Sequence, residues 1–152
     1  MSKKPVYSPD LRIRRARAAD APRIAALTTQ LGYRTSPARM AIRLKPVLRA
    51  KNAACFVGET KPEGVIGWTH VSVTPLLEVE RRAELNGLVV DERVRSRGAG
   101  ARFLEEAEKW ARKMRCTEMS VRSNVIRERA HHFYLREGYE HNKTQKTFRK
   151  VL

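Results

Sequence analysis

The segment VVDERVRSRGAG, Val89 to Gly100, carries the strongest fold signal in this sequence. An apolar, strand-like run ends at Val90, an arginine-rich turn follows, and Gly98 and Gly100 open a stretch with helical periodicity. Free N–H groups at a helix N-terminus, beside glycines that allow close approach, form a site for an anion such as a pyrophosphate. A tight turn with solvated arginines is the alternative, and the Lys-Ser/Thr of a nucleoside triphosphate loop is lacking.

The regions on both sides of this segment have clear periodicities. Downstream, apolar residues recur at helical spacing for about four turns, which predicts an amphipathic helix. These residues are Phe103, Leu104, Ala107, Trp110, Ala111 and Met114. Upstream lie three β-rich runs, AACFVGET, GVIGWTHVSV and AELNGLVV, and the turn KPEG joins the first two. We expect an antiparallel meander here.

The remaining segments predict further strands and helices. LRIRRAR suggests an edge strand, Asp20 a helix N-cap, and SPARMAIRLKPVLRAK a helix capped by Ser36 and kinked or broken at Pro46. EMSVRS is expected as a short strand, RERAHHFYLREG as a helix that Gly138 ends, and KTFRKVL as a terminal strand. The order β-α-α-β-β-β-α-β-α-β describes an α+β fold with helices on both faces of a sheet.

Length and composition limit the classes of protein. The 152 residues suit one domain, which we place at 11–152 after a flexible polar tail at 1–10. The net charge of +16 attracts polyanions of any kind, including nucleic acids and phosphorylated cofactors. Cys55 and Cys116 have the context of buried free thiols, and no signal peptide or membrane span is present, so we expect a cytoplasmic protein. The four histidines form no metal-ligand pattern.

Two motifs resemble one enzyme family. LVVDERVRSRGAGARFLEEAEKWA is similar to the acetyl-CoA-binding motif of GNAT-type N-acetyltransferases, Arg/Gln-x-x-Gly-x-Gly/Ala after a hydrophobic strand, and Arg95, Gly98 and Gly100 match it. SNVIRERAHHFYLREGYEHNKTQKTFRKVL resembles the C-terminal signature of the same family: strand, Asn, a helix with Ala-x-x-Phe-Tyr, Gly-Tyr/Phe and a closing strand. Together the motifs and the element order cover nearly the whole chain beyond the tail.

The resemblance implies a fold, an activity and a cofactor. The fold would be a central mixed, mostly antiparallel sheet of six or seven strands with about four flanking helices. The activity would be transfer of an acetyl group from acetyl-CoA to a primary amine, by direct attack in a ternary complex. The pantetheine arm would pair with the strand end like an added strand, and amides of the following loop would hold the pyrophosphate. The cofactor-binding residues implied are Leu88, Val89, Val90, Arg95, Ser96, Arg97, Gly98, Ala99, Gly100, Ala101, Asn124, Ala130 and Tyr134.

Two of the implied roles are catalytic. Tyr134 corresponds to the general acid that protonates the departing CoA thiolate, and a core role beside its neighbours is the alternative. Glu84, eleven residues before Arg95, matches the position of a catalytic glutamate that acts as base directly or through water. Strand alternation would place Glu84 on the same side as Asn86, Leu88 and Val90, although a surface salt bridge to a nearby arginine would also explain it.

Other positions remain open at this stage. Asn124 could contact the cofactor arm or cap the following helix, and Arg127 stands where the family more often has Asn or Asp. His70 lies on a predicted strand near the cleft, where a substrate contact and a structural role are both open. AHHFYLREGYE most resembles the branch that acetylates small amines, including aminoalkylphosphonate and aminoglycoside-like acceptors.

Three further alternatives concern partners. A protein or peptide acceptor, with a lysine or an N-terminal amine, remains open because a peptide can lie across the same cleft. A basic nucleic-acid- or ribosome-binding module without catalysis is the alternative from another class, but no aromatic stacking surface accompanies the basic residues. Because the family is often dimeric, a homodimer is also one expectation.

Overall fold

The computed structural model describes residues 10–95 and 97–152, which fall into two compact units. The first unit ends at Val121 and the second runs from Arg122 to Leu152. The first contains β1 (Arg12–Arg15), α1 (Ala21–Gln30), α2 (Pro37–Arg49), β2 (Ala53–Thr60), β3 (Gly64–Val73), β4 (Arg82–Val90), α3 (Ala99–Lys113) and β5 (Glu118–Val121), with short 3-10 turns at Ala18–Asp20 and Glu92–Val94. The second contains α4 (Glu128–Arg136).

The sheet has the order β1-β2-β3-β4-β5. Neighbouring strands are antiparallel except β4 and β5, which are parallel. The α+β class, the meander and the mixed, mostly antiparallel sheet are therefore confirmed, with five strands in the described residues rather than six or seven.

The terminal strand expected in KTFRKVL is wrong. Residues 139–152 form neither helix nor strand, and Phe148 is 91% exposed. A β-prone run becomes a strand only when a sheet edge pairs with its backbone, and local composition alone does not supply that partner.

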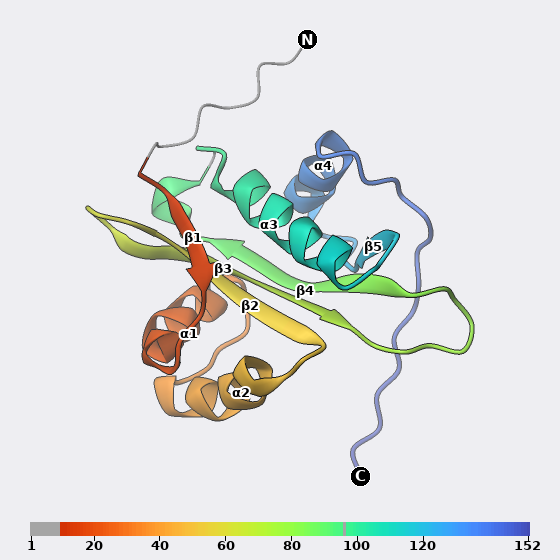
Figure 1. Cartoon of the computed structure of the whole chain (residues 1–152), viewed down its shortest axis with the longest axis horizontal. Helices are drawn as coiled ribbons and strands as arrows, with labels where there is room; N and C mark the ends of the chain where they lie inside the picture. The colour runs from red at the N-terminus through yellow and green to blue at the C-terminus, as the bar shows by residue number, and fades with distance from the viewer. Residues whose placement is uncertain (1–9, 96) are drawn as a thin grey trace. The chain divides into compact units, whose positions relative to one another are not determined.

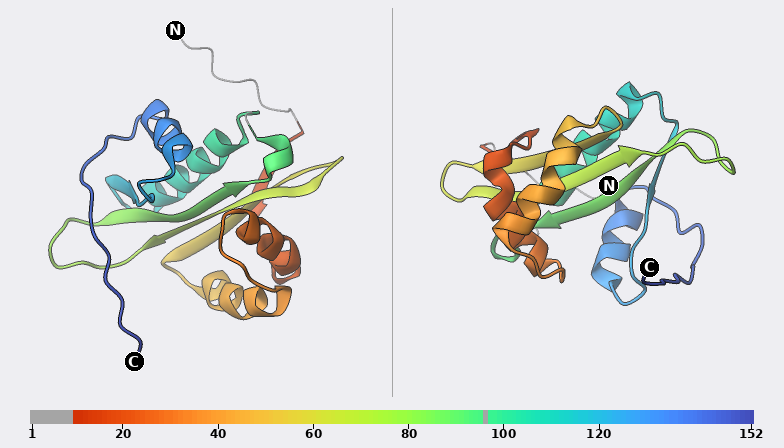
Figure 2. Two further views of the ribbon diagram at one scale, coloured as in Figure 1. Left: turned by 180° about the vertical axis from the view of Figure 1, so that it is seen from behind. Right: turned by 90° about the horizontal axis from the view of Figure 1, so that it is seen from below.

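Helices cover both faces of the sheet in the first unit. Figure 1 shows α1 and α2 on one face and α3 on the other, and the reversed view in Figure 2 shows the same layers. One buried cluster joins α1 and α2 to the sheet through Ile24, Met40, Leu44, Val57 and the partly buried Trp68. A second cluster joins α3 to the other face through Phe103, Ala99, Ile66, Val90 and the partly buried Leu88.

The position of α3 depends on glycines beneath it. A Cβ atom on Gly58 would lie 2.6 Å from the ring of Phe103, and one on Gly67 would lie 2.5 Å from the carbonyl oxygen of Val89. Both distances are shorter than side chains tolerate, so these positions allow the fully buried Phe103 ring to rest directly on the sheet. The N-terminus of α3 is thereby held above the end of β4.

The predicted helix starts are correct, but two local details differ. Ser36 caps α2 as expected, accepting a hydrogen bond from the Arg39 amide at 3.2 Å, and α2 continues unbroken through Pro46. Asp20 does not cap α1 through its side chain. Its carboxylate instead accepts hydrogen bonds from the Arg17 amide at 2.7 Å and from the Arg14 guanidinium at 2.9 and 3.0 Å, because it lies at the end of a preceding 3-10 turn.

Candidate active site

β4 has two halves with different partners. In Arg82–Leu85, the paired half, all four residues pair with β5 on one side, and those from Ala83 to Leu85 pair with β3 on the other. His70 of β3 faces Gly87 while Val71 faces Leu85, so Asn86 is an extra residue, a β-bulge. Beyond it, Leu88–Val90, the open half, pairs with β3 and has no strand on the β5 side in the described residues. A bulge bends its strand and ends pairing, which accounts for the open edge.

The bulge corrects the expected side of Glu84. Paired residues share a face, and Glu84 lies opposite Ser72, which alternates with Trp68 on the face covered by α1 and α2. Asn86 donates to the Ser72 hydroxyl at 2.7 Å and so lies on that face too. Leu88 and Val90 instead join the α3 cluster, on the opposite face. One extra residue reverses the alternation, and Glu84 therefore does not share a side with Leu88 and Val90.

The backbone N–H and C=O groups of the three residues in the open half point in two directions, towards β3 or towards the open edge. The Asp91 amide donates to Ile66 of β3 at 2.7 Å, and the carbonyl oxygen of Val89 also lies against β3. Because the backbone polar groups of successive strand residues alternate in direction, those of Leu88 and Val90 are directed to the open edge. Of the three residues assigned to the pantetheine arm, Leu88 and the N–H of Val90 are directed to an added strand, the Val90 carbonyl accepts from Arg95, and Val89 is bonded within the sheet.

The N-terminus of α3 has the properties of an anion site. Gly98 has a left-handed φ of 83°, which favours glycine, and immediately precedes the helix. The first helical hydrogen bond runs from the Arg102 amide to the Gly98 carbonyl at 3.4 Å, so the amides of Ala99, Gly100 and Ala101 are not used within the helix. Three such amides and the positive end of the helix dipole are suited to an anion such as a diphosphate.

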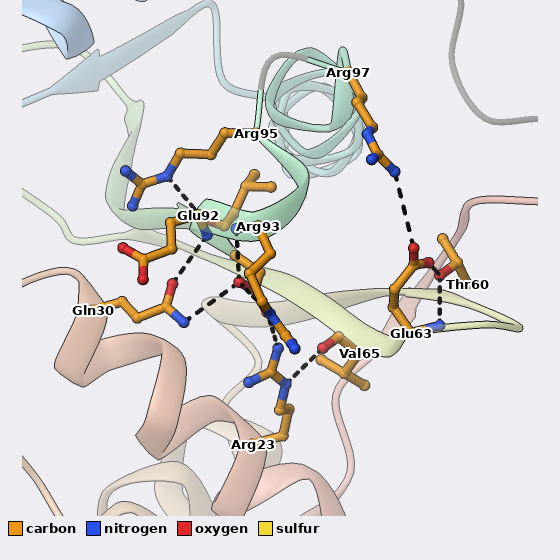
Figure 3. Close-up of polar contacts among 11 residues, drawn as sticks. Arg23, Gln30, Thr60, Glu63, Val65, Glu92, Arg93, Arg95 and Arg97 are labelled. Atoms are coloured by element: carbon orange, nitrogen blue, oxygen red, sulfur yellow. Dashed lines mark hydrogen bonds and ion pairs between the residues drawn. The ribbon is translucent and has the colours of Figure 1, made fainter.

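The arginines before α3 have separate contacts. Nε of Arg95 donates to the Val90 carbonyl at 3.1 Å, which ties the loop to the open half of β4. Arg97 lies 3.9 Å from Glu63 of the β2–β3 turn, in an exposed ion pair (Figure 3). Ser96, also expected at the cofactor, lies outside the described residues.

Sequence reasoning missed a buried carboxylate, Asp91. Its side chain is 1% exposed and accepts hydrogen bonds from Arg93, with Nη2 at 2.7 Å and the backbone amide at 3.1 Å, and from Arg23 of α1. The hydrogen bonds from Arg93, with that from Arg23, lower the pKa of Asp91 well below its usual range. Its only signal in the sequence was an acidic residue directly after an apolar strand, since Arg23 lies 68 positions away.

The candidate base and its neighbours lie on the α1/α2 face. His70 and Ser72 of β3 share this face with Glu84 of β4. Burial lowers the pKa of His70, so this imidazole is neutral near pH 7. The face therefore presents a carboxylate and a neutral imidazole, the kinds of group that accept a proton from an amine.

The second unit holds the remaining candidate residues, Asn124, Ala130 and Tyr134. Asn124 accepts a hydrogen bond from the Ile126 amide at 3.1 Å through its side chain, and its carbonyl accepts one from His131 at 2.9 Å, so it orders the turn before α4. Ala130 and Tyr134 lie on α4, one turn apart. Burial raises the pKa of Tyr134 to about 12, which keeps its hydroxyl protonated at neutral pH, as a general acid requires.

Comparison with known proteins places the chain in a family. The family model described as "Acetyltransferase (GNAT) family" matches residues 14–139. The chain belongs to this family. It is accordingly an N-acetyltransferase, and its cofactor is acetyl-CoA. No curated protein sequence matches it.

Solved structures agree with the fold. The aminoglycoside N-acetyltransferase AAC(6')-Iy in complex with CoA superposes with a TM-score of 0.83 at 18% identity, covering 93% of this chain and 95% of that one. The same enzyme with the bisubstrate analogue CoA-S-monomethyl-acetylneamine gives 0.82 at 18% identity, covering 93% and 99%. AAC(6')-Ih from Acinetobacter baumannii gives 0.81 at 16% identity, with the same coverage. At identities of 16–18%, these superpositions establish a shared fold and nothing beyond it.

Among residues 10–95 and 97–152, no group of three or more His, Cys, Asp or Glu side chains is arranged to hold a metal ion. None of the helices in that part of the chain combines the length and apolar composition that a membrane span requires.

Proposed function

We propose that this enzyme acetylates a primary amine of a small molecule, by direct attack of the amine on acetyl-CoA in a ternary complex. The open half of β4, followed after a short loop by the amides at the start of α3 that the helix itself does not use, is the observation that carries the proposal. An extended thioester arm can add to the open edge as a strand does, with its pyrophosphate at the helix N-terminus. The thioester carbonyl would then lie near the bulge, where the strand splits.

The proposed roles of residues in the first unit follow from this placement, and that of Tyr134 in the second unit rests on the family resemblance. Leu88 and Val90 bond the pantetheine arm through their backbones, and residues Arg95–Ala101 hold the pyrophosphate. Glu84 accepts the ammonium proton, directly or through water, so that the neutral amine attacks the thioester carbon. The C–S bond then breaks, Tyr134 donates its proton to the departing thiolate, and the nitrogen of the new amide loses its second proton, through water, to restore the tyrosine hydroxyl. Cys55 and Cys116 are buried and are not nucleophiles in this scheme.

The acceptor class rests on resemblance. AHHFYLREGYE resembles the branch that acetylates small amines, and structural neighbours are aminoglycoside N-acetyltransferases. The net charge of +16 favours acceptors with an anionic group, such as aminoalkylphosphonates, over polycationic ones.

We further propose that the two units form one acetyltransferase domain, because the family match runs from residue 14 to 139 and crosses the unit boundary at Val121. The buried free thiols of Cys55 and Cys116 are consistent with a cytoplasmic location. The family's frequent dimerisation supports a homodimer.

An acceptor panel tests the function. Thiol release from acetyl-CoA is followed with an aminoalkylphosphonate, an aminoglycoside, a simple alkylamine, a lysine peptide and a peptide with a free N-terminus. We expect the highest kcat/KM for a small amine, with intersecting initial-velocity lines, as a ternary complex requires. A peptide preference would contradict the small-molecule acceptor. The activity itself would be contradicted if no amine were turned over and if duplex DNA, but not acetyl-CoA, raised the melting temperature of the protein.

Glu84→Gln provides the control for chemistry within this panel. Because Glu84 lies on the face away from Leu88 and Val90, the variant should keep the acetyl-CoA melting shift while kcat falls about 100-fold. Glu80→Gln, at an exposed position before β4, should leave both unchanged. An unaltered kcat in Glu84→Gln would remove this residue from the base role.

A further inference from the structure

Asp91 joins three elements at the start of the loop that leads to α3. Figure 3 shows Arg23, Gln30, Glu92 and Arg93, the labelled residues around the start of this loop. Arg93, two residues later, binds its carboxylate through both side chain and backbone. From α1, Arg23 donates to the same carboxylate, and the Gln30 amide group lies 3.5 Å from it.

The same side chains also bond the surrounding backbone. Nε of Arg23 donates to the Val65 carbonyl of β3 at 2.8 Å. The Gln30 side-chain oxygen accepts from the Glu92 amide at 3.1 Å. We call Asp91, Arg93, Arg23, Gln30 and these two backbone contacts the Asp91 network. It connects α1, β3 and the loop through one carboxylate.

The charges in this network are unequally exposed. Asp91 is 1% exposed, whereas the Arg93 side chain, bonded to it, is 70% exposed and the Arg23 side chain 30%. A buried ion pair is a costly way to gain stability, because its desolvation offsets most of the attraction. Such a network does, however, fix the conformation of the segment that carries it, and preorganisation lowers the ordering entropy that a ligand must overcome on binding.

The network lies next to the proposed diphosphate site in sequence and in space. Val90 immediately precedes Asp91 in the chain. Its carbonyl accepts a hydrogen bond from the side chain of Arg95, which follows the Asp91 network in the loop. Val94, within the same loop, packs in the cluster that holds Ala99 at the first position of α3. The loop is therefore bonded at Asp91, Glu92, Arg93 and Arg95 before it reaches the amides of α3.

We propose that Asp91 is a positioning residue for the diphosphate of the acetyl donor: it holds residues 91–95 against α1 and β3, and this sets the amides of α3 for the anion. The inference rests on the diphosphate site described under the proposed function. Asp91 does not touch the reacting atoms, so its effect should be on donor affinity and not on the acetyl-transfer step.

Two acetyl donors distinguish this role from general stabilisation. Acetyl-CoA carries the diphosphate, whereas acetyl-pantetheine carries the same thioester arm without it. In Asp91→Asn, KM for acetyl-CoA should rise about tenfold or more, because the charge-assisted hydrogen bonds that fix the loop are weakened. KM for acetyl-pantetheine and kcat with either donor should stay within about twofold of the wild type.

Asp20→Asn is the matched control. Asp20 is also a buried carboxylate held by an arginine, but it lies before α1 and its partner is Arg14 of β1, which also pairs with Glu59 of β2. Its replacement should lower Tm without changing the ratio of the two KM values. Gln30→Ala is the second variant, used if Asp91→Asn does not fold. It removes the bond to the Glu92 amide and keeps the arginine pairs, and KM for acetyl-CoA alone should rise about threefold.

The outcomes separate the two proposals. A rise in KM that is equal for both donors, or no rise in either folded variant, overturns the positioning role of Asp91 and leaves the diphosphate site intact. If the wild-type enzyme binds acetyl-pantetheine as tightly as acetyl-CoA, both the diphosphate site and the positioning role of Asp91 are overturned. The diphosphate would then add nothing to the affinity for the donor.

Discussion

The two halves of β4 differ in composition, RAEL at 82–85 against LVV at 88–90, and in their surroundings. Arg82–Leu85 is enclosed between β3 and β5, and its carboxylate Glu84 is directed to the α1/α2 face. Leu88–Val90 is paired on one side, and its other edge, which has no strand beside it in the described residues, leads towards the start of α3. Under the proposed function, the paired half serves the acceptor amine and the open half binds the donor.

The difference between the halves comes from a single residue. Asn86 adds one position to β4 relative to β3, and this shift both changes the face of every later side chain and frees the edge. Under the proposed function, a bulge therefore lets one strand serve both substrates, the acetyl donor along its open edge and the amine acceptor on the α1/α2 face. Three variants test this division.

The largest effect is expected for Gly98→Glu, at the end of the open half. The new side chain would place bulk and negative charge before the amides of α3, at a residue whose φ is 83°. We expect the Kd for acetyl-CoA to rise more than about 100-fold, measured by calorimetry. Gly64→Glu is the control, because Gly64 also has a positive φ, 71°, but open space around its Cβ position. It should keep the acetyl-CoA affinity, and tight binding by Gly98→Glu would contradict the anion site.

A smaller effect is expected for Tyr134→Phe, which separates chemistry from donor binding. Loss of the hydroxyl should lower kcat about 100-fold with the Kd for acetyl-CoA unchanged. Because the pKa of Tyr134 is raised to about 12, the folded enzyme keeps this proton above pH 10. Wild-type kcat should therefore not decline between about pH 8 and 10 through Tyr134. An unchanged kcat in the variant would exclude the general-acid role, whereas a tyrosine-dependent decline in that pH range would contradict the raised pKa of Tyr134.

The smallest effect distinguishes the two edges of the open half. Leu88→Pro removes an N–H directed to the open edge, so KM for acetyl-CoA should rise about fivefold with the fold retained. Val89→Pro removes an N–H bonded to β3 and should lower Tm by roughly 6–12 °C. Leu88→Ala removes the same side chain and keeps the N–H. If it raises KM as much as Leu88→Pro does, the backbone does not pair with the donor.

Much of the fold could be predicted because its signals are local. Ser36 and Pro37 start α2, the apolar repeat from Phe103 defines α3, and Gly98 allows the turn between strand and helix. Such features depend on residues a few positions apart, which a sequence displays directly. KTFRKVL shows the limit of this reasoning, since its residues favour a strand but residues 139–152 form none.

Parts of the candidate site could not be predicted in this way. The side of Glu84 relative to Leu88 was wrong because strand alternation assumes an unbroken register, and the bulge at Asn86 arises from pairing with β3. The Asp91 network was missed because its members are distant in the chain and nothing in the local composition indicates that a carboxylate will be buried.

The sequence by itself determined the class of fold, the order of elements up to α4 and the motif of Arg95, Gly98 and Gly100, since these follow from local periodicity and turn chemistry. The tertiary structure alone decided which backbone groups of β4 remain available, which face Glu84 occupies and why Asp91 is buried. Those features depend on strand register and on contacts between distant segments, which form only when the chain packs.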